Sequence, residues 1–460
     1  MKASSVLLIN PWIADFAAYD LWAKPLGLLY VGKFLRNYGY ELQLIDLTDR
    51  LRWNNSDPAT KLSGRGKYHK TIIPKPEAVT HVPRRFGLYG ATREQFLSAL
   101  QNIDPPKAIL LTSHMSYWYP GIVETVKILR ESFPTAKIIL GGIYASLFPG
   151  HARRIVQPDH LITGYGEKQT LMLLDTIYEI ERDYSKIPEF DDSGILPWDL
   201  YPKINAAAMM SSRGCPLHCD YCATPYLNPR FLQRAPEDVI SEIVCLYEQL
   251  DVRQFAFYDD ALFINKKRHI IPILKGLLKH GVNAKFHTPN GLFAREIDPD
   301  LAMLMKRTGF QTIRVSLESI IPKWQKASTD KVSTDHFNLA LKNLENAGYK
   351  RSDIEAYLIM GLPGQRYSDI EKSICYVAEL GAVSRLASYS PIPHTAHWNR
   401  AKALGSVWDE IDPLLTNNTL YPCATRDFPV EKFLELRQLS NDLNKFVKKS
   451  LLQEDNKWAL

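Results

Sequence analysis

Short apolar segments alternate with amphipathic helical segments along most of the chain, and this alternation restricts the fold more than any other feature. In residues 1–170 the segments that read as strands are Val6–Asn10, Glu41–Leu47, Ala108–Ser113, Lys137–Gly142 and His160–Glu167. Between them, 28–39 and 120–132 repeat apolar residues at helical spacing. Strand–helix alternation predicts a parallel sheet covered by helices on both faces. We therefore expect an α/β fold whose first part is a Rossmann-like parallel sheet.

A second strand–helix series begins at residue 206. Its candidate strands are 206–212, 254–258, 284–288, 312–317, 354–360 and 386–390. A complete barrel of the TIM type has eight strand–helix units and takes about 250 residues. Six units in a shorter stretch predict an open, partial (βα)6 barrel.

These patterns give the expected domain boundaries. Residues 1–182 form the Rossmann-like domain, and 183–205, which are polar, contain prolines and lack periodicity, form a linker. Residues 206–400 form the partial barrel, and 401–460 form a small helical C-terminal region. In parallel sheets, ligands bind outside the carboxyl ends of the strands, so functional residues are expected there in both domains.

Composition indicates a cytoplasmic globular protein. No run of about 18 uncharged apolar residues is present, so we expect no membrane span. The first residues contain an apolar run too short for a signal peptide, which leaves the six cysteines reduced or bound to metal.

The basic charge of the chain is concentrated in one stretch. Residues 61–90 hold seven Lys or Arg and one acid, Glu77, so this stretch accounts for the net charge of +6. The remainder is balanced, which argues against a nucleic-acid-binding surface. We interpret the stretch as a solvated loop, with an anion or RNA contact as the alternative.

Three cysteines lie close together after the first strand of the second series. Cys215, Cys219 and Cys222 stand in the sequence "RGCPLHCDYC" with CxxxCxxC spacing. A structural zinc site normally needs four ligands, and His218 lies between two of the cysteines, where it could not easily complete a tetrahedron. A [4Fe–4S] cluster held by three thiolates, with one iron open to another ligand, suits the spacing better. Buried free thiols or a zinc knuckle are the alternatives.

The remaining cysteines predict no second cluster. Cys245 and Cys375 lie in helical patterns, where a cysteine is usually a small core residue. Cys423 lies in a loop-like segment.

This cysteine motif, with Tyr221 just before its last cysteine, resembles the signature of radical S-adenosylmethionine (SAM) enzymes. The resemblance implies two cofactors, a [4Fe–4S] cluster and S-adenosyl-L-methionine chelated to its open iron. It also implies that SAM is cleaved by one electron to methionine and a 5′-deoxyadenosyl radical. The electron would come from an external one-electron reductant of the flavodoxin or ferredoxin type. The protein would supply orientation and a water-poor cavity.

The same resemblance assigns SAM-binding residues at the ends of the predicted barrel strands. By similarity, Glu318 binds the ribose hydroxyls, Gly361 and Gly364 allow close backbone approach, and Tyr221 lies at the adenine. The other candidates in these strand-end segments are Asp259, Asp260, Ser316 and Pro391. No residue that acts directly on the substrate can be named.

The first domain resembles the cobalamin-binding domain of cobalamin-dependent radical SAM proteins. The resemblance lies in Lys24–Leu47, Lys137–Ala152 and Asp159–Asp175. It implies cobalamin at the carboxyl edge of the sheet, with its nucleotide tail near Ser113, Gly141 and Gly142. Candidate residues around it are Asn10, Ser113, Gly141, Gly142, Gly164 and Glu167.

The sequence departs from the cobalamin-binding pattern at one point. The loop after the first strand, "NPWIADFAAYDLWAKPLG", lacks the cobalt-ligating histidine of a DxHxxG motif. His114, Tyr117, Trp118 and Tyr119 follow the third strand and would face the same ligand space. A vestigial domain that only caps the barrel or binds substrate remains the alternative.

The expected activity is cobalamin-dependent methyl transfer to an unactivated carbon of an unknown substrate, started by the 5′-deoxyadenosyl radical. One alternative is a radical SAM enzyme without cobalamin that performs rearrangement, dehydrogenation or sulfur insertion. Another, from a different class, is a metal-stabilised RNA-binding protein that uses the basic stretch.

Overall fold

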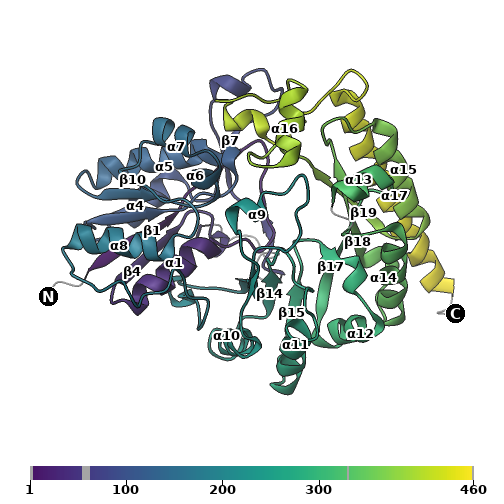
Figure 1. Cartoon of the computed structure of the whole chain (residues 1–460), viewed down its shortest axis with the longest axis horizontal. Coiled ribbons are helices and arrows are strands. Elements are labelled where there is room, and N and C mark those ends of the chain that lie inside the picture. The colour runs from purple at the N-terminus through teal and green to yellow at the C-terminus, as the bar shows by residue number, and fades with distance from the viewer. Residues whose placement is uncertain (1–3, 54–62, 329–330, 458–460) are drawn as a thin grey trace. The chain divides into compact units, whose positions relative to one another are not determined.

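The computed structural model describes residues 4–53, 63–328 and 331–457, with side chains described as far as Lys449. The chain divides into two compact units, coloured along the sequence in Figure 1. Unit 1 comprises Met1–Ala208, Glu248–Val252 and Glu410–Leu415, and unit 2 comprises Met209–Tyr247, Arg253–Asp409 and Thr416–Leu460. Lys61 and Leu62 of the basic stretch lie outside the described residues.

Unit 1 is built on a five-stranded parallel sheet in the order β10-β9-β8-β1-β4. Its strands are β1 (Ser5–Asn10), β4 (Glu41–Asp46), β8 (Ala108–Leu111), β9 (Lys137–Leu140) and β10 (His160–Leu161). Every residue of β8 is buried, as expected for a central strand covered on both faces. This order confirms the Rossmann-like sheet predicted from the sequence.

Helices and small strands complete the first unit. The helices are α1 (Leu26–Asn37), α2 (Arg50–Trp53), α4 (Arg93–Leu100), α5 (Tyr119–Ser132), α6 (Ile143–Leu147), α7 (Pro149–Ile155) and α8 (Glu167–Tyr178). Helices α1 and α8 pack side by side (Figure 1). The short strands β2 (Ile13–Asp15), β6 (Lys70–Ile72) and β7 (Gly87–Tyr89) form one small antiparallel sheet, and β3 (Tyr19–Asp20) pairs with β5 (Gly66–Lys67).

The segment expected as a linker packs along unit 1. Lys33 of α1 donates from its ammonium to the carbonyl oxygens of Asp191 and Ser193. Trp198 is almost fully buried, and the Tyr201 hydroxyl donates to Asp46 at the end of β4. A segment without periodicity can therefore still be fixed by side-chain contacts.

The second sheet has the order β11-β14-β15-β17-β18-β19 with β16 on β17, and its strands from β14 onward belong to unit 2. The strands are β11 (Ala206–Met209), β14 (Gln254–Phe257), β15 (Lys285–His287), β16 (Leu292–Phe293), β17 (Phe310–Glu318), β18 (Ile354–Met360) and β19 (Val383–Ser388). The pairs from β14 to β19 are parallel, and the partial barrel is confirmed. The sixth strand begins at Val383, three residues before the predicted start.

Helices line the outer side of this sheet in Figure 1. They are α10 (Pro236–Gln249), α11 (Ile270–Lys279), α12 (Pro299–Thr308), α14 (Thr334–Asn346) and α15 (Tyr367–Glu379), while the short α13 (Pro322–Ala327) follows the carboxyl end of β17. Near the carboxyl ends of the strands lie α9 (Thr224–Leu227) and α16 (Ala396–Ala403), while the long α17 (Val430–Lys457) packs on α15 and β19. The predicted helical C-terminal region is thus present. No helix in the described ranges is both long and apolar enough to cross a membrane.

Candidate active site

The cysteine loop, residues 214–222, begins where the chain leaves the short strand β12 (Ser212–Arg213). Strand β12 pairs antiparallel with β13 (Leu232–Gln233), so the segment that contains the cysteine loop begins and ends in one short two-stranded sheet. Gly214 has a φ of +76°, and a Cβ there would lie 2.5 Å from the Arg230 carbonyl oxygen. A glycine is needed because any side chain would strain this turn.

Asp259, which follows β14, holds the segment that leads into this loop by hydrogen bonds. Its carboxylate accepts hydrogen bonds from the Ser211 amide at 3.0 Å, the Ser211 hydroxyl at 2.7 Å and the Ser212 hydroxyl at 2.6 Å. Buried carboxylates are stable when their acceptor positions are filled in this way. The side chain of Asp259 therefore serves the loop directly, and its assignment to SAM stays a prediction.

Two further segments hold the middle of the cysteine loop. The Asp220 amide donates to the Ala327 carbonyl oxygen at 2.9 Å, and Cys219 Sγ lies 3.4 Å from the Ser328 carbonyl oxygen. From the other side, the His397 amide donates to the Asp220 carbonyl oxygen at 2.8 Å. Arg400 Nη2 lies 3.2 Å from Asp220 Oδ2. The N-terminal half of α16 thus clamps the loop between its second and third cysteines.

The three thiols of this loop are partly accessible and near one another. All six cysteines lie in the described part of the chain, and none is in a disulfide. Burial raises the pKa of Cys215 to about 11, and the charges of Asp260, Cys219 and Cys222 act in the same direction. Without a cation the Cys215 thiol stays protonated at neutral pH, so a metal must displace its proton to bind.

The arrangement of possible ligands also bears on the kind of metal site. Among the described residues, no three His, Cys, Asp or Glu side chains converge on a point where they could hold one ion. In a [4Fe–4S] cluster each thiolate binds a different iron, so convergence on one point is not required. The donor set therefore fits a cluster better than a single zinc ion.

Glu318 and Lys331 form a buried ion pair at the carboxyl end of β17. Lys331 Nζ lies 2.6 Å from Glu318 Oε1, and the two side chains are 11% and 8% exposed. Burial lowers the pKa of Lys331, but Glu318 and then Cys219 and Cys215 outweigh it, so the net shift is upward. Lys331 is thus an ammonium group that interacts electrostatically with both the Glu318 carboxylate and the cysteine loop. It was missed from the sequence because no motif or periodicity marks it.

Several other predicted SAM-binding residues lie at the same edge of the sheet. Asp260 keeps access to water, yet crowding by protein atoms and the neighbouring Asp259 raise its pKa to about 6. Tyr221 packs edge-on against His397, with ring centroids 6.4 Å apart. Ser316 on β17 and Pro391 after β19 are buried.

The two glycines of "GLPG" differ in their surroundings. Gly361 has a φ of +94°, and a Cβ there would meet the Tyr421 ring at 2.9 Å. Its amide donates to Gln365 Oε1 at 2.8 Å, so internal packing alone requires this glycine. Gly364, at a φ of +77°, faces open space. Their roles toward SAM remain predictions.

The residues predicted around cobalamin lie at the carboxyl edge of the unit 1 sheet. The Asn10 amide donates to Asp46 and Thr48, and the Ser113 hydroxyl donates to the Gly141 carbonyl oxygen. A Cβ on Gly142 would lie 2.3 Å from the Ser113 carbonyl oxygen. Asn10, Ser113 and Gly142 are therefore engaged by their own neighbours.

The other three candidates differ in accessibility. Glu167 is buried at the first turn of α8. A Cβ on Gly164 would meet nothing within 4 Å, and one on Gly141 would make only ordinary contacts, the nearest at 3.8 Å. The backbone at Gly141 and Gly164 is therefore open to a large ligand.

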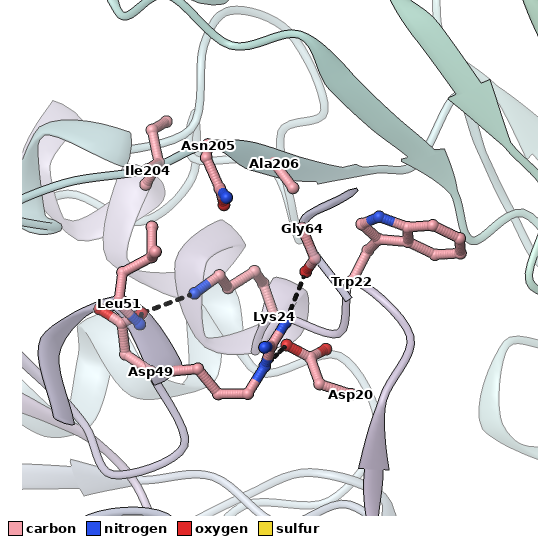
Figure 2. Close-up of a pocket in the computed structure, with 10 residues that line it drawn as sticks. Asp20, Trp22, Lys24, Asp49, Leu51, Gly64, Ile204, Asn205 and Ala206 are labelled. Atoms are coloured by element: carbon pink, nitrogen blue, oxygen red, sulfur yellow. Dashed lines mark hydrogen bonds and ion pairs between the residues drawn. The ribbon is translucent and has the colours of Figure 1, made fainter. Parts of the chain in front are cut away.

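A small polar pocket in unit 1 was not predicted (Figure 2). Lys24 Nζ lies 3.3 Å from Asp49 Oδ1, and Arg50 lies 2.8 Å from Asp20 and donates to the Gly64 carbonyl oxygen. Asp49 Oδ2 is buried and has no hydrogen-bond partner among the described residues. The free space is of the order of one water molecule. The pocket is too small for a cofactor, and a bound water would satisfy Asp49.

Comparison with known families identifies the second unit. The model of the radical SAM superfamily matches residues 209–376, which contain the cysteine loop, Glu318 and the GLPG turn. Residues 209–376 therefore form a radical SAM domain. The prediction made from the cysteine motif is thereby confirmed for this domain, and the protein is an enzyme.

Relatives of this radical SAM protein are distant in sequence. It is 21% identical over 446 residues to cytidylyl-2-hydroxyethylphosphonate methyltransferase of Streptomyces wedmorensis, covering 83% of this chain and 78% of that protein. It is 24% identical over 225 residues to an uncharacterized methyltransferase of Pyrococcus horikoshii, covering 48% of this chain and 47% of that protein.

Solved structures share the fold of this radical SAM protein. One is the radical SAM methyltransferase TsrM from Kitasatospora setae with cobalamin and a [4Fe–4S] cluster bound. Its TM-score is 0.64 at 16% identity, over 88% of this chain and 79% of that one. Another is the cobalamin-dependent radical SAM enzyme OxsB with aqua-cobalamin bound. Its TM-score is 0.56 at 13% identity, over 96% of this chain and 62% of that one. The likeness covers both units, which confirms the predicted fold class.

Proposed function

We propose that this radical SAM protein binds a [4Fe–4S] cluster through Cys215, Cys219 and Cys222 and binds SAM beside it. The observation that carries the proposal is a fastened loop of three partly accessible thiols at the same sheet edge as Glu318 and Lys331. The chemistry supplied at such a site is one-electron cleavage of SAM to methionine and a 5′-deoxyadenosyl radical.

The chain's own residues hold and orient the participants. Lys331 offers a buried ammonium to an anionic group such as the carboxylate of SAM, and Glu318 offers oxygen acceptors to hydroxyl groups. Asp259 and the N-terminal half of α16 fix the cysteine loop and therefore the place where SAM is held. Burial of the ion pair keeps water away from it, which strengthens every electrostatic contact there.

We further propose that unit 1 binds cobalamin and that the reaction is methyl transfer to an unactivated carbon. The open backbone at Gly141 and Gly164 fits a large ligand at the carboxyl edge of the sheet. A methyltransferase relative that matches 83% of this chain in sequence and the cobalamin-containing TsrM structure, whose fold matches 88% of it, support the assignment. Cobalamin would supply the methyl group that reacts with a substrate radical.

The rest of the proposal concerns partners and location. An external one-electron donor of the flavodoxin or ferredoxin type and a cytoplasmic location suit a protein with six cysteines and no disulfide. The substrate of this reaction is a molecule with an unactivated carbon. A radical SAM enzyme without cobalamin that performs rearrangement, dehydrogenation or sulfur insertion is the second candidate, because three of the six cobalamin candidates are engaged internally.

The cluster proposal is tested by anaerobic purification and reconstitution of the full chain. We expect about four iron and four sulfide per chain, and 5′-deoxyadenosine after addition of reductant and SAM. Cys215→Ala, Cys219→Ala and Cys222→Ala should each lose the cluster and the product. Cys245→Ala, on α10, is the matched control and should retain both. One zinc per chain, or a reconstituted cluster that yields no 5′-deoxyadenosine, would overturn the proposal.

Cobalamin binding is tested by corrin absorption after loading and gel filtration. Gly141→Phe should fill the open edge and prevent retention of cobalamin, while Gly150→Phe, on the exposed side of α7, should not. Failure of the unaltered protein to retain cobalamin would favour the second candidate without affecting the cluster.

A further inference from the structure

His114 occupies a central position at the carboxyl edge of the unit 1 sheet. It follows Ser113 and comes three residues after the end of β8. Strand β8 is the middle strand of the order β10-β9-β8-β1-β4. Ligands of such sheets bind outside the carboxyl ends of the strands. His114, shortly after the central strand, therefore lies near the middle of the edge proposed to receive cobalamin.

The imidazole of His114 is available to a ligand. The side chain is partly accessible to water, and neither ring nitrogen has a hydrogen-bond partner in the described part of the chain. Crowding by protein atoms lowers the pKa of His114 against the opposing effect of Asp46, so the ring is neutral at pH 7. A neutral imidazole nitrogen with a free lone pair is the form that binds metals.

The other residues that follow strands of this sheet are less suited to bind cobalt. Pro11 and Trp12 follow β1, and the Trp12 indole N–H donates to the Ala91 carbonyl oxygen. Leu47 and Thr48 follow β4, and the Thr48 hydroxyl donates to Asp46. Gly141 and Gly142 follow β9, while Ile162 and Thr163 follow β10. Among these described residues only His114 offers an uncommitted nitrogen, and the neighbouring Met115 offers a thioether that is 46% exposed.

We propose that His114 supplies an imidazole nitrogen to the cobalt of bound cobalamin. The loop after β1 lacks a histidine, so the chain would provide the ligand from the neighbouring strand β8 instead. Asp46 acts as a supporting charge, because it lies close enough to influence His114 electrostatically and is itself fixed by Asn10, Thr48 and Tyr201. Carboxylates near metal-bound histidines commonly orient the ring and stabilise the bound state. This inference rests on the proposed cobalamin binding.

The test is electron paramagnetic resonance of the cobalamin-loaded full-length protein, reduced to cob(II)alamin under anaerobic conditions. An axial nitrogen splits each cobalt line into a triplet. Growth with nitrogen-15 histidine should convert the triplet into a doublet, because a protein imidazole is then the ligand. His114→Phe should retain cobalamin but lose the nitrogen splitting. His114→Gly should regain it when free imidazole is added.

Met115→Leu is the matched control and should keep the splitting of the unaltered protein. A triplet insensitive to the histidine label would identify the nucleotide base of cobalamin as ligand and overturn the inference. A spectrum without nitrogen splitting in the unaltered protein would overturn it as well. Absence of bound cobalamin would overturn both this inference and the cobalamin part of the proposed function, while formation of 5′-deoxyadenosine would still report on the cluster and SAM.

Discussion

Lys331 donates to Glu318 across 2.6 Å, and Glu318 makes this contact from a left-handed backbone conformation with a φ of +64°. A non-glycine residue in this region is strained and persists where the surrounding structure fixes it. Here the strain places a carboxylate at the carboxyl end of β17, within reach of an ammonium that also senses Cys215 and Cys219. The pair thus connects the ribose-binding residue expected from the sequence with the cysteine loop.

Replacement of Lys331 by Met should weaken SAM binding and the fold together. Loss of the ammonium leaves Glu318 buried without a cation, which costs about 3 kcal/mol of folding stability. If Lys331 holds the carboxylate of SAM, affinity measured by equilibrium dialysis on the cluster-containing protein should fall at least about tenfold, or ~1.4 kcal/mol. Lys323→Met, at an exposed lysine of α13, is the control. Unchanged SAM affinity in Lys331→Met would contradict the assignment.

The change in folding stability on replacing His394 should depend on backbone strain at this position. It has a φ of +66°, and its ring stacks on Tyr226 with centroids 3.8 Å apart. His394→Gly relieves about 1 kcal/mol of strain and loses about 1 kcal/mol of stacking, so stability should change little. His394→Ala loses the stacking and keeps the strain, and should be less stable than His394→Gly in thermal unfolding.

The control for this prediction is a position in a helix, where alanine rather than glycine should give the more stable variant. At exposed Asn399 on α16, alanine should be more stable than glycine by about 1 kcal/mol. Equal stability of His394→Gly and His394→Ala, with the expected difference at Asn399, would show that the left-handed conformation is not enforced.

The strands could be predicted from the sequence where burial is continuous, and less well where it is not. Strand β18 matches its predicted bounds because Ile354–Met360 is apolar in most positions. Strand β19 begins at Val383, three residues before its predicted start, because this first part of the strand contains polar residues. The Ser384 hydroxyl forms a hydrogen bond with Ser440 of α17, and Arg385 forms an ion pair with Glu355. Such partners lie far away in the sequence, and a local apolar pattern cannot show them.

In the candidate site as well, features marked locally in the sequence could be predicted, and contacts between distant segments could not. The three cysteines were predicted from a motif with fixed spacing, and Glu318 was predicted from the family resemblance at the end of a predicted strand. Lys331 and the contacts of His397 and Arg400 with Asp220 depend on folding, which brings α16 to the loop. The hydrogen bonds from Ser211 and Ser212 to the Asp259 carboxylate depend on folding in the same way, and the expected role of Asp259 toward SAM stays a prediction.

Arg314 and Glu355 should show strong coupling in a double-mutant cycle. Arg314 is almost fully buried on β17 and donates from Nε to Glu355 Oε2 at 2.7 Å. Arg314→Met should cost about 3 kcal/mol because it breaks a buried pair. Adding Glu355→Gln should recover part of this loss, since the Glu355 carboxylate otherwise keeps only the half-exposed Arg385 as a cationic partner. Arg385→Met, at the 46% exposed partner of Glu355, should cost less than about 1 kcal/mol in denaturant unfolding.

Stability of the first unit should fall in mild acid because of His151. Its Nδ1 lies 2.7 Å from the Tyr144 hydroxyl, and burial lowers the pKa of His151 despite the opposing charge of Asp412. The unfolded chain, with an ordinary histidine pKa of about 6.5, then binds more protons than the folded chain. The free energy that the neutral His151 ring contributes to folding is therefore complete above about pH 6.5. It decreases as the pH falls toward the folded-state pKa, by at most about 1.4 kcal/mol per pH unit.

The measurement is the melting temperature of the full chain from pH 7.5 to 5. The fall of the melting temperature with decreasing pH should be smaller in His151→Gln and unchanged in the exposed control His218→Gln. An identical slope in His151→Gln and the unaltered protein would exclude His151 as a source of acid sensitivity.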